Sequence, residues 1–506
     1  MKRTKIVATL GPASSEAAII GKLMDAGVNV FRLNFSHGAH EDHARNIQRI
    51  RAEASRRDAP IAILQDLCGP KMRTGKLPED GVRLETGAVA ALFSSGAEPA
   101  VPESLARIPV DIPQFAERVA PGARVLINDG LVRLTVQSIA HGAALCLVDA
   151  GGVVLSRKGV NLPGGATRID AITSKDIGDL KMGLEHGVDW VALSFVRGVN
   201  DIETLRAHMK QFGRSVPIIA KIEKSEAVEA MDAIVAAADG IMVARGDLGV
   251  EVNIEETPLI QKQLIRACLA AGKPVITATQ MLESMIENPI PTRAEAADVA
   301  NAIFDGTDAL MLSGETAVGR RPVEVVETMA RIAERAENSD EYHQRRQICL
   351  RGMPHMAAPA AFGEREASAP VPDMADAIGS AACEIASSIG AVGIVACTMG
   401  GTTARRIARY RPPQPLFAVT PNEETYRRLS LTWGTQPILT GMKDDDSDLL
   451  EGSVGEVCRR AKLRGPARLV VTAGLPIRVR GITNLIRVMD VPAQESDDSD
   501  ATSSLP

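Results

Sequence analysis

The chain has 506 residues, too many for one ordinary domain and enough for roughly two to four. Hydrophobic residues make up 45% and charged residues 24%, which is typical of a water-soluble globular protein, and no apolar run reaches the ~20 residues that cross a bilayer. The net charge of −6 argues against a general role in binding nucleic acid or a membrane surface. Seven scattered cysteines predict reduced thiols and a cytoplasmic location.

Apolar, strand-like runs alternate with helical stretches from the N-terminus onward. The expected strands are Lys5–Leu10, Val28–Leu33, Pro60–Gln65, Asp189–Phe195, Val216–Ala220, Gly240–Ala244, Pro274–Ala278 and Asp308–Leu312. The expected helices include one opened by Ser14 and Ser15 and ending at Gly27, then Glu41–Arg57, Ser174–Glu185, one from Val199, an Ala-rich helix of about three turns before Gly240, Pro258–Ala271, Ala294–Phe304 and Pro322–Glu337. Strand followed by helix, repeated in this way, predicts a (β/α)₈ TIM barrel, an α/β fold.

The alternation is interrupted once. Residues 70–166 are rich in Gly, Pro and Val and contain short alternating runs such as Val132–Val136, so we expect an inserted small β-barrel domain after the third strand. It leaves the barrel at the carboxyl end of that strand, where it could close over a site as a lid. The barrel itself is expected at 1–69 and 167–345, followed by a linker at 346–373, a C-terminal α/β domain at 374–492 and a disordered tail at 493–506.

Two adjacent strands end in charged residues. One runs into Lys221-Ile222-Glu223 and the next into Arg245-Gly246-Asp247. Because residues i and i+2 of a strand share a face, Lys221 and Glu223 point the same way, and Glu223 and Asp247 lie at one edge of neighbouring parallel strands. Two carboxylates with open positions beside them suit Mg²⁺, and the neighbouring ammonium suits a phosphate. Strand ends also carry charge simply because they face solvent, so this pattern alone leaves both interpretations open.

The other strands end in the same way. The residues just past the strands include Gly11, Pro12, Arg32, Asn34, Ser36, His37, Asp66, Phe195, Arg197, Thr279, Gln280, Ser313 and Glu315. Barrel active sites are built at this carboxyl face from the ends of several strands. So many polar groups beyond apolar strands predict a catalytic site there.

The C-terminal domain contains a short hydroxyl-rich loop between an expected strand, Val392–Cys397, and an expected helix, Ala404–Tyr410. The loop reads Thr398-Met399-Gly400-Gly401-Thr402-Thr403. Backbone N–H groups at a helix start can bind a phosphate. For the loop taken alone, an ordinary helix cap with two glycines for the turn is the favoured interpretation.

Taken together, these motifs resemble those of the pyruvate kinase family. The resemblance runs in order from about residue 2 to residue 492, and its motifs are long and specific. They are Thr9-Leu10-Gly11-Pro12-Ala13-Ser14, Phe31-Arg32-Leu33-Asn34-Phe35-Ser36-His37-Gly38, Lys158-Gly159-Val160-Asn161-Leu162-Pro163-Gly164, Lys221-Ile222-Glu223, Met242-Val243-Ala244-Arg245-Gly246-Asp247-Leu248-Gly249-Val250-Glu251, Ala278-Thr279-Gln280-Met281-Leu282-Glu283-Ser284-Met285 and Leu312-Ser313-Gly314-Glu315-Thr316.

The resemblance implies phosphoryl transfer from phosphoenolpyruvate to ADP, giving pyruvate and ATP in glycolysis. It implies that Glu223 and Asp247 hold Mg²⁺ or Mn²⁺, and that Lys221 stabilises charge on the transferring phosphoryl group and on the enolate. Gly246 and Asp247 would offer backbone N–H groups, and Thr279 a hydroxyl, to the substrate carboxylate. Positioning and charge neutralisation are what such a transfer needs.

Further residues take roles by the same resemblance. Arg32 and Arg73 would contact phosphates, and His37, Asn34 and Lys158 would contact the nucleotide. Thr279, Ser313 and Glu315 would lie where the enolate is protonated on carbon, with the proton donor left open among them.

A monovalent-cation site is also implied. It comprises Asn34, Ser36, Asp66 and the carbonyl of Leu67. Family members with Glu at the position of Lys71 need potassium, whereas members with Lys there do not and often carry Leu at the position of Leu67. Because a lysine ammonium is a compact cation, we expect activity without K⁺. Cys68 departs from the family pattern, Thr74 follows the potassium-dependent pattern, and Lys71 could instead be a solvated hinge lysine.

In the C-terminal domain, Thr398–Thr403 matches the loop that binds the effector phosphate in regulated members. The segment Gly474–Asn484, with Arg478 and Arg480, corresponds to a second effector loop. A sugar phosphate or AMP is the kind of effector expected, and the family resemblance also implies a homotetramer.

Three other functions compete with this one. A Mg²⁺-dependent pyruvate or enolate barrel lyase would use Lys221, Glu223 and Asp247, but Arg73 and Lys158 of the insertion favour a nucleotide. A non-catalytic sensor would lack at least one metal or phosphate group in the barrel, and each expected group is present. Nucleic-acid binding lacks a basic patch and an aromatic platform.

Overall fold

The computed structural model describes residues 2–128, 130–163, 170–351, 374–442, 445–463, 466–475 and 482–491. The chain divides into two compact units. One contains residues 1–5, 54–62 and 333–506, and the other contains 6–53 and 63–332. Within the described residues, no helix combines the length and hydropathy that crossing a bilayer requires.

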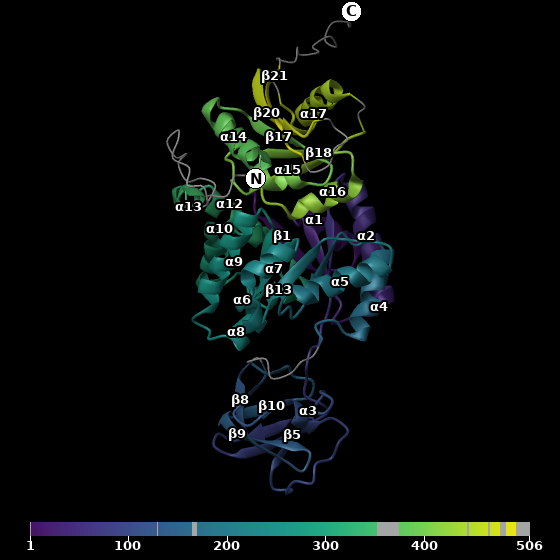
Figure 1. Cartoon of the computed structure of the whole chain (residues 1–506), viewed down its shortest axis with the longest axis vertical. Helices are drawn as coiled ribbons and strands as arrows, with labels where there is room; N and C mark the ends of the chain where they lie inside the picture. Colours follow the sequence, from purple (N-terminus) through teal and green to yellow (C-terminus); the bar gives the residue numbers. More distant parts are fainter. Residues whose placement is uncertain are drawn as a thin grey trace, which may run out of the picture. The chain divides into compact units, whose positions relative to one another are not determined.

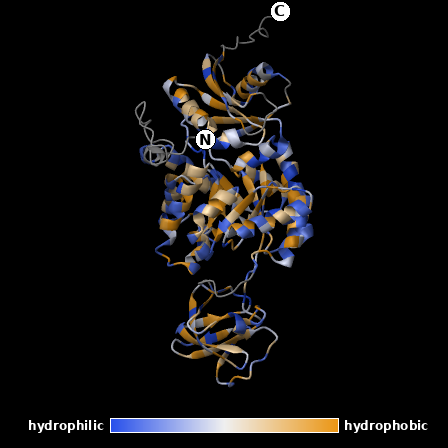
Figure 2. Cartoon of the chain, viewed as in Figure 1, coloured by the Kyte–Doolittle hydropathy of each residue, from blue (hydrophilic) through white to orange (hydrophobic). Residues whose placement is uncertain are grey.

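Eight strands form a closed barrel, as expected. Its strands are β1 (Lys5–Thr9), β2 (Val30–Asn34), β3 (Ala62–Asp66), β12 (Trp190–Leu193), β13 (Ile218–Ile222), β14 (Gly240–Ala244), β15 (Val275–Ala278) and β16 (Ala309–Leu312). They neighbour one another in the order β1-β16-β15-β14-β13-β12-β3-β2. Strands such as β1, β3 and β14 are buried along their whole length because both faces of a parallel barrel are covered. Figure 2 shows the strands as largely hydrophobic.

Helices surround the barrel strands (Figure 1). They are α1 (Ala17–Asp25), α2 (His40–Arg56), α4 (Ser174–Glu185), α5 (Val199–Gln211), α6 (Ser225–Glu229), α7 (Met231–Ala237), α8 (Arg245–Glu251), α9 (Thr257–Ala271), the 3-10 helix η1 (Glu283–Ile286), α10 (Arg293–Asp305), α11 (Gly314–Ala317) and α12 (Pro322–Glu337). Capping boxes begin α4 at Thr173 and α10 at Thr292, which explains why these helices begin sharply.

Two helix predictions were wrong in detail. The single helix expected before β14 is two short helices, because Ala230 leaves the helical conformation and its N–H bonds the carbonyls of both Glu226 and Val228, which ends α6. Neither Ser14 nor Ser15 caps α1. The Ser14 hydroxyl accepts from the Gly11 N–H and the Ser15 hydroxyl donates to the Gly11 carbonyl, so the turn after β1 uses both.

The inserted segment is an all-β unit with one short helix. Its elements are β4 (Val82–Leu84), β5 (Val89–Ser94), β6 (Ala106–Val110), α3 (Phe115–Arg118), β7 (Arg124–Ile127), β8 (Val132–Ala140), β9 (Ala143–Ala150), β10 (Gly152–Val154) and β11 (Val160–Asn161). A six-stranded sheet, β11-β7-β8-β9-β5-β6, and a pair, β10-β4, enclose their own apolar core. Each side of this core is built from alternating residues, as the period-two pattern predicted.

The C-terminal part contains a five-stranded sheet in the order β19-β18-β17-β20-β21. Its elements are α14 (Met374–Ser388), β17 (Gly393–Cys397), α15 (Thr402–Ala408), β18 (Leu416–Thr420), α16 (Glu423–Arg428), η2 (Leu429–Leu431), β19 (Thr435–Leu439), α17 (Asp446–Ala461), β20 (Ala467–Ala473) and β21 (Leu485–Val491). Apolar clusters on the two faces of the sheet involve α14 and α15 on one side and α17 on the other. Helix α13 (Asp340–Arg351) includes the start of the expected linker, while 352–373 and the tail from 492 lie outside the described residues.

Candidate active site

A cavity of about 110 Å³ lies at the carboxyl ends of the barrel strands. It is lined by Arg32, Asn34, Ser36, His37, Cys68, Lys71, Ser194, Phe195, Lys221, Glu223, Met242, Ala244, Asp247, Thr279, Met311 and Ser313. Most of the predicted catalytic, metal and substrate residues therefore meet around one space. Asp66, Leu67, Arg73, Gly246 and Glu315 do not line it but lie within two residues of ones that do, whereas Lys158 neither lines it nor lies near a lining residue in the chain.

Asp66 is the hub of the charged groups. Its Oδ2 accepts from Arg32 Nε at 2.6 Å, and its Oδ1 accepts from Lys221 Nζ at 3.2 Å. Lys221 Nζ also lies 2.7 Å from Ser194 Oγ and 2.9 Å from Glu223 Oε1. The Asp66 and Glu223 side chains are only 1% exposed, and Lys221 is 11% exposed. The strand ends thus hold two cations and two carboxylates in a nearly dry cluster.

The charges of this cluster shift one another's titration. Burial disfavours ionisation of Asp66, but Arg32 and Lys221 outweigh it and hold the pKa of the carboxyl below its usual value. Burial disfavours the Lys221 ammonium, but Asp66 and Glu223 raise its pKa above the usual value. Burial raises the pKa of Glu223, Lys221 opposes this, and the neighbouring Asp247 carboxyl adds to it. The lysine is therefore a fixed positive charge.

The second predicted metal ligand begins a helix. Asp247 lies in the first turn of α8, directly after β14, and lines the cavity with Glu223. The Gly246 N–H donates to Thr279 Oγ1 at 2.8 Å, and that hydroxyl donates to the Ala278 carbonyl at 2.6 Å. Thr279 adopts a left-handed backbone with φ of 69°. The hydroxyl is thereby fixed between the ends of β14 and β15 at the edge of the cavity.

Glu315 supports the wall rather than lining it. Its Oε2 accepts from the Ser313 N–H at 2.7 Å, and its Oε1 accepts from the Leu282 N–H at 3.2 Å. It is 2% exposed, and burial raises the pKa of its carboxyl although these N–H groups oppose the shift. Glu315 therefore joins the segments after β15 and β16 and orients Ser313, which does line the cavity.

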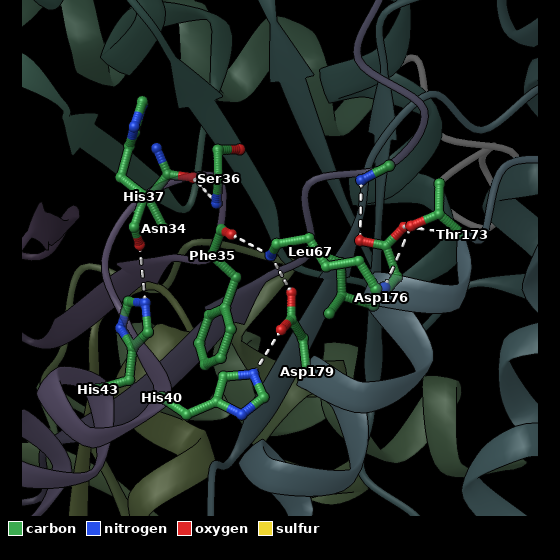
Figure 3. A network of polar contacts seen from close by, with 12 residues as sticks. Asn34, Phe35, Ser36, His37, His40, His43, Leu67, Thr173, Asp176 and Asp179 are labelled. Atoms are coloured by element: carbon green, nitrogen blue, oxygen red, sulfur yellow. Dashed lines mark hydrogen bonds and ion pairs between the residues drawn. The ribbon is translucent and has the colours of Figure 1, made fainter. Parts of the chain in front are cut away.

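The predicted monovalent-cation residues lie at the carboxyl ends of β2 and β3 and just after them. Asn34 Oδ1 accepts from the Ser36 N–H at 3.1 Å (Figure 3). The Phe35 N–H donates to the Asp66 carbonyl at 3.0 Å. The Leu67 carbonyl accepts from Ser194 Oγ at 2.7 Å. Ser194 was not predicted, because it follows β12 inside an apolar stretch and only the barrel register brings it beside Lys221.

Arg73 and Lys158 lie on the two strands of chain that lead into and out of the insertion. Arg73 forms an antiparallel bridge with Gly159, and the Thr74 N–H donates to the Lys158 carbonyl at 2.8 Å. Burial lowers the pKa of His37, and the charges of Arg73, Lys71 and Arg32 lower it further. His37 therefore faces a strongly positive region, as an anion site requires.

A larger cavity, of about 440 Å³, lies in the C-terminal part. Its lining residues include Thr398, Gly400, Thr402 and Thr403, and it also touches Thr483. The Gly401 N–H donates to Thr398 Oγ1 at 2.9 Å, with Gly401 at φ of 83°. Helix α15 begins at Thr402, two residues earlier than expected. Arg478 and Arg480 lie outside the described residues.

Comparison with known proteins is consistent along the chain. The family model described as "Pyruvate kinase, barrel domain" matches residues 1–326, and "Pyruvate kinase, alpha/beta domain" matches 376–489. "Pyruvate kinase 2" of Synechocystis sp. is 43% identical over 97% of this chain and 80% of its own length. "Pyruvate kinase" of Agrobacterium vitis is 44% identical over 98% of both chains, and that of Geobacillus stearothermophilus is 42% identical over 96% of this chain and 80% of its own.

Proposed function

The chain belongs to the pyruvate kinase family, and we propose that its barrel cavity is where phosphoenolpyruvate gives its phosphoryl group to ADP. In this reaction the bond between phosphorus and the enol oxygen breaks, and a bond to an ADP β-phosphate oxygen forms. The enolate left behind then takes a proton on carbon and becomes pyruvate. The observation that supports this site is the meeting of Arg32, Lys221, Glu223 and Asp247 at one cavity. The relatives favour a kinase over the barrel lyase.

Glu223 and Asp247 suit a divalent cation, for which Mg²⁺ is the family's usual choice. Glu223 is buried, and its pKa is raised by burial and by the Asp247 carboxyl despite Lys221. A dication relieves this mutual repulsion, and oxygen ligands with open positions are what Mg²⁺ prefers. When bound, the ion would supply charge neutralisation for the phosphoryl group and the enolate.

Lys221 would stabilise negative charge on the transferring phosphoryl group and on the enolate oxygen. Its ammonium is fixed by Asp66, Ser194 and Glu223, so little reorganisation is needed when charge develops beside it. Arg32, held by Asp66, would bind the same phosphoryl group. Substrate carboxylate recognition would fall to Thr279 and to backbone N–H groups of Gly246 and Asp247. The Thr279 hydroxyl accepts from the Gly246 N–H and donates to the Ala278 carbonyl, so its proton would turn from that carbonyl to the ligand when substrate binds.

Protonation of the enolate would take place beside Thr279 and Ser313. Both residues line the cavity, and both carry hydroxyl groups that can pass a proton directly or through water. Glu315 would act on this step through Ser313, because its carboxylate accepts a hydrogen bond from the Ser313 backbone N–H.

The nucleotide would bind where positive charge gathers, at Asn34, His37, Arg73 and Lys158. The lowered pKa of His37, caused by burial and then by Arg73, Lys71 and Arg32, keeps its imidazole neutral near pH 7 and able to hydrogen-bond without repelling these cations. The insertion, residues 70–166, would close over the bound nucleotide.

Lys71 would replace potassium at the site of Asn34, Ser36, Asp66 and Leu67. The support is that Lys71 lines the same cavity as Asn34 and Ser36. The test is pyruvate formation from phosphoenolpyruvate, ADP and Mg²⁺ in potassium-free buffer, repeated with KCl. Equal rates support the built-in cation. A rate that appears only with KCl removes the Lys71 proposal and leaves the kinase, whereas no pyruvate in either buffer removes the proposed site.

The C-terminal cavity would bind a phosphorylated effector, a sugar phosphate or AMP, through Thr398, Gly400, Gly401, Thr402 and Thr403. Its size and its hydroxyl-rich lining support this role. We further propose a cytoplasmic homotetramer with the domain limits given above. Activation curves with ribose 5-phosphate, AMP and fructose 1,6-bisphosphate, together with light scattering for mass, would test these points.

A further inference from the structure

The segment Asn34–His37, here called the β2 loop, carries three residues that line the cavity. It contacts helix α4 through Lys175 and helix α2 through His43. The carbonyl of Phe35, in the middle of the loop, accepts a hydrogen bond from Lys175 Nζ at 2.7 Å. The Phe35 ring stacks on His43 with centroids 4.0 Å apart (Figure 3). His43 Nε2 lies 2.9 Å from the His37 carbonyl and donates to it, since a carbonyl only accepts. The loop is therefore fixed by contacts to its backbone.

Asp179 ties these contacts together. Its side chain is 2% exposed, and its carboxylate bonds Lys175 Nζ at 2.5 Å and His40 Nε2 at 2.7 Å (Figure 3). Its backbone carbonyl accepts from Gln65 Nε2 at 2.6 Å. A desolvated carboxylate strongly favours keeping its partners. The Lys175 ammonium is thereby held between Asp179 and the Phe35 carbonyl.

The same helix also holds the segment after β3. Asp176, fully buried, accepts from the Gly69 N–H at 3.0 Å while it completes the Thr173 capping box. Gly69 has φ of 65°, and a Cβ there would come within 2.9 Å of the Phe195 ring. The first two turns of α4 therefore hydrogen-bond to both the β2 loop and the segment after β3, which border the cavity.

We propose that Lys175 is a positioning residue for the phosphoryl transfer: through the Phe35 carbonyl it sets the β2 loop, and thereby Asn34, Ser36 and His37, in the conformation that binds the nucleotide. This inference rests on the proposed nucleotide site. Lys175 itself does not line the cavity. It acts on the loop through the loop's backbone.

A purely structural role predicts something different. The Lys175 side chain is 58% exposed, but its partner Asp179 is 2% exposed, so removal of the ammonium leaves a buried carboxylate paired with His40. Lys175→Met should therefore lower the melting temperature, and a purely structural role would then weaken the binding of both substrates in proportion. A change in the geometry of the β2 loop should instead appear in nucleotide binding, because the loop's cavity-lining residues are predicted nucleotide and cation contacts.

The experiment compares Lys175→Met with Lys181→Met in the full-length enzyme. Lys181 lies on the same helix, is 59% exposed and pairs only loosely with Glu185 at 4.0 Å, so its variant removes the same charge without touching the loop. We expect Lys175→Met to raise KM for ADP about 10-fold, as loss of a supporting contact does at other sites, with KM for phosphoenolpyruvate changed less than about 2-fold. Lys181→Met should match the wild type. Lys175→Arg, which keeps the donor, should restore most of the ADP affinity.

Three results would overturn the inference. These are a Lys175→Met variant indistinguishable from Lys181→Met, a proportional loss for both substrates with a lowered melting temperature, or an ADP effect that disappears at high salt. The last would mark a long-range charge effect, because added salt screens such effects but does not restore a missing contact. A wild type that makes no pyruvate would instead reject the proposed function, so the two failures are distinguishable.

Discussion

Replacing Asp66 by Asn tests the charged cluster beneath the cavity. The carboxylate accepts from two cations, Arg32 at 2.6 Å and Lys221 at 3.2 Å, and is 1% exposed. Asn keeps the shape and can accept from one of them, but its NH₂ group then faces the other. One charge-assisted hydrogen bond is worth about 1.5–3 kcal/mol, and breaking a buried pair costs about 3–5 kcal/mol. Because Lys221 keeps Glu223 and Ser194, we expect the low end, about 3 kcal/mol.

The assay must report the barrel alone, since a chain of two compact units need not unfold in one transition. Trp190, 3% exposed on β12, pairs with Leu64 of β3, the strand that ends in Asp66. Denaturant unfolding followed by Trp190 fluorescence in a Trp433→Phe background isolates this signal. Asp232→Asn, at an exposed position in α7, is the matched control. A free energy of unfolding for Asp66→Asn equal to that of the control would refute the cluster argument.

Three further predictions concern other parts of the barrel. Lys71→Glu should make pyruvate formation depend on added KCl, and a variant still fully active without potassium would contradict the built-in cation. The Glu295 carboxylate accepts four hydrogen bonds. Burial opposes its ionisation, but these donors hold its pKa below the usual 4.5. Its contribution to stability is therefore present above pH 4.5 and is lost as the pH falls through the lower pKa of the folded state. The melting temperature of Glu295→Gln should therefore be lower than that of the wild type near neutral pH, and this difference should shrink in acid. A difference that grows in acid would contradict the lowered pKa of Glu295. Gly183→Ala would bring a Cβ within 2.0 Å of Gln65 Oε1 in a fully buried site and should cost about 1–3 kcal/mol by Trp190 fluorescence, whereas no loss would show that Gln65 can move aside.

Much of the fold was predictable because the barrel strands are continuous apolar runs. Strand β19 was not predicted, and the reason lies in Pro437 and Gln436, which interrupt its apolar pattern. It lies at the edge of its sheet, where a missing N–H is tolerated. The break at Ala230 between α6 and α7 could not be predicted from this Ala-rich sequence, because alanine fits a helix and its end equally well.

Most residues that line the cavity could be predicted from the sequence, but the hydrogen bonds and ion pairs between them could not. Lys221 lies near the carboxyl end of its strand, and Glu223 and Asp247 follow theirs, so position along the chain was enough to bring them together. The hub role of Asp66 depends on which strands neighbour β3, and the supporting role of Lys175 depends on the contact of α4 with the β2 loop. Both join residues more than 100 positions apart, and no local pattern encodes such a pairing.

The most direct test is pyruvate formation from phosphoenolpyruvate, ADP and Mg²⁺ by the wild type and by Lys221→Met. Methionine keeps the length of the side chain and removes the fixed positive charge, so the site should still form but lack stabilisation for the developing charge. We predict an active wild type and a variant whose kcat is lower by about 10³-fold or more, with a comparable circular dichroism spectrum. A folded Lys221→Met variant that makes pyruvate at nearly the wild-type rate would contradict the assignment of the barrel cavity as the site of phosphoryl transfer.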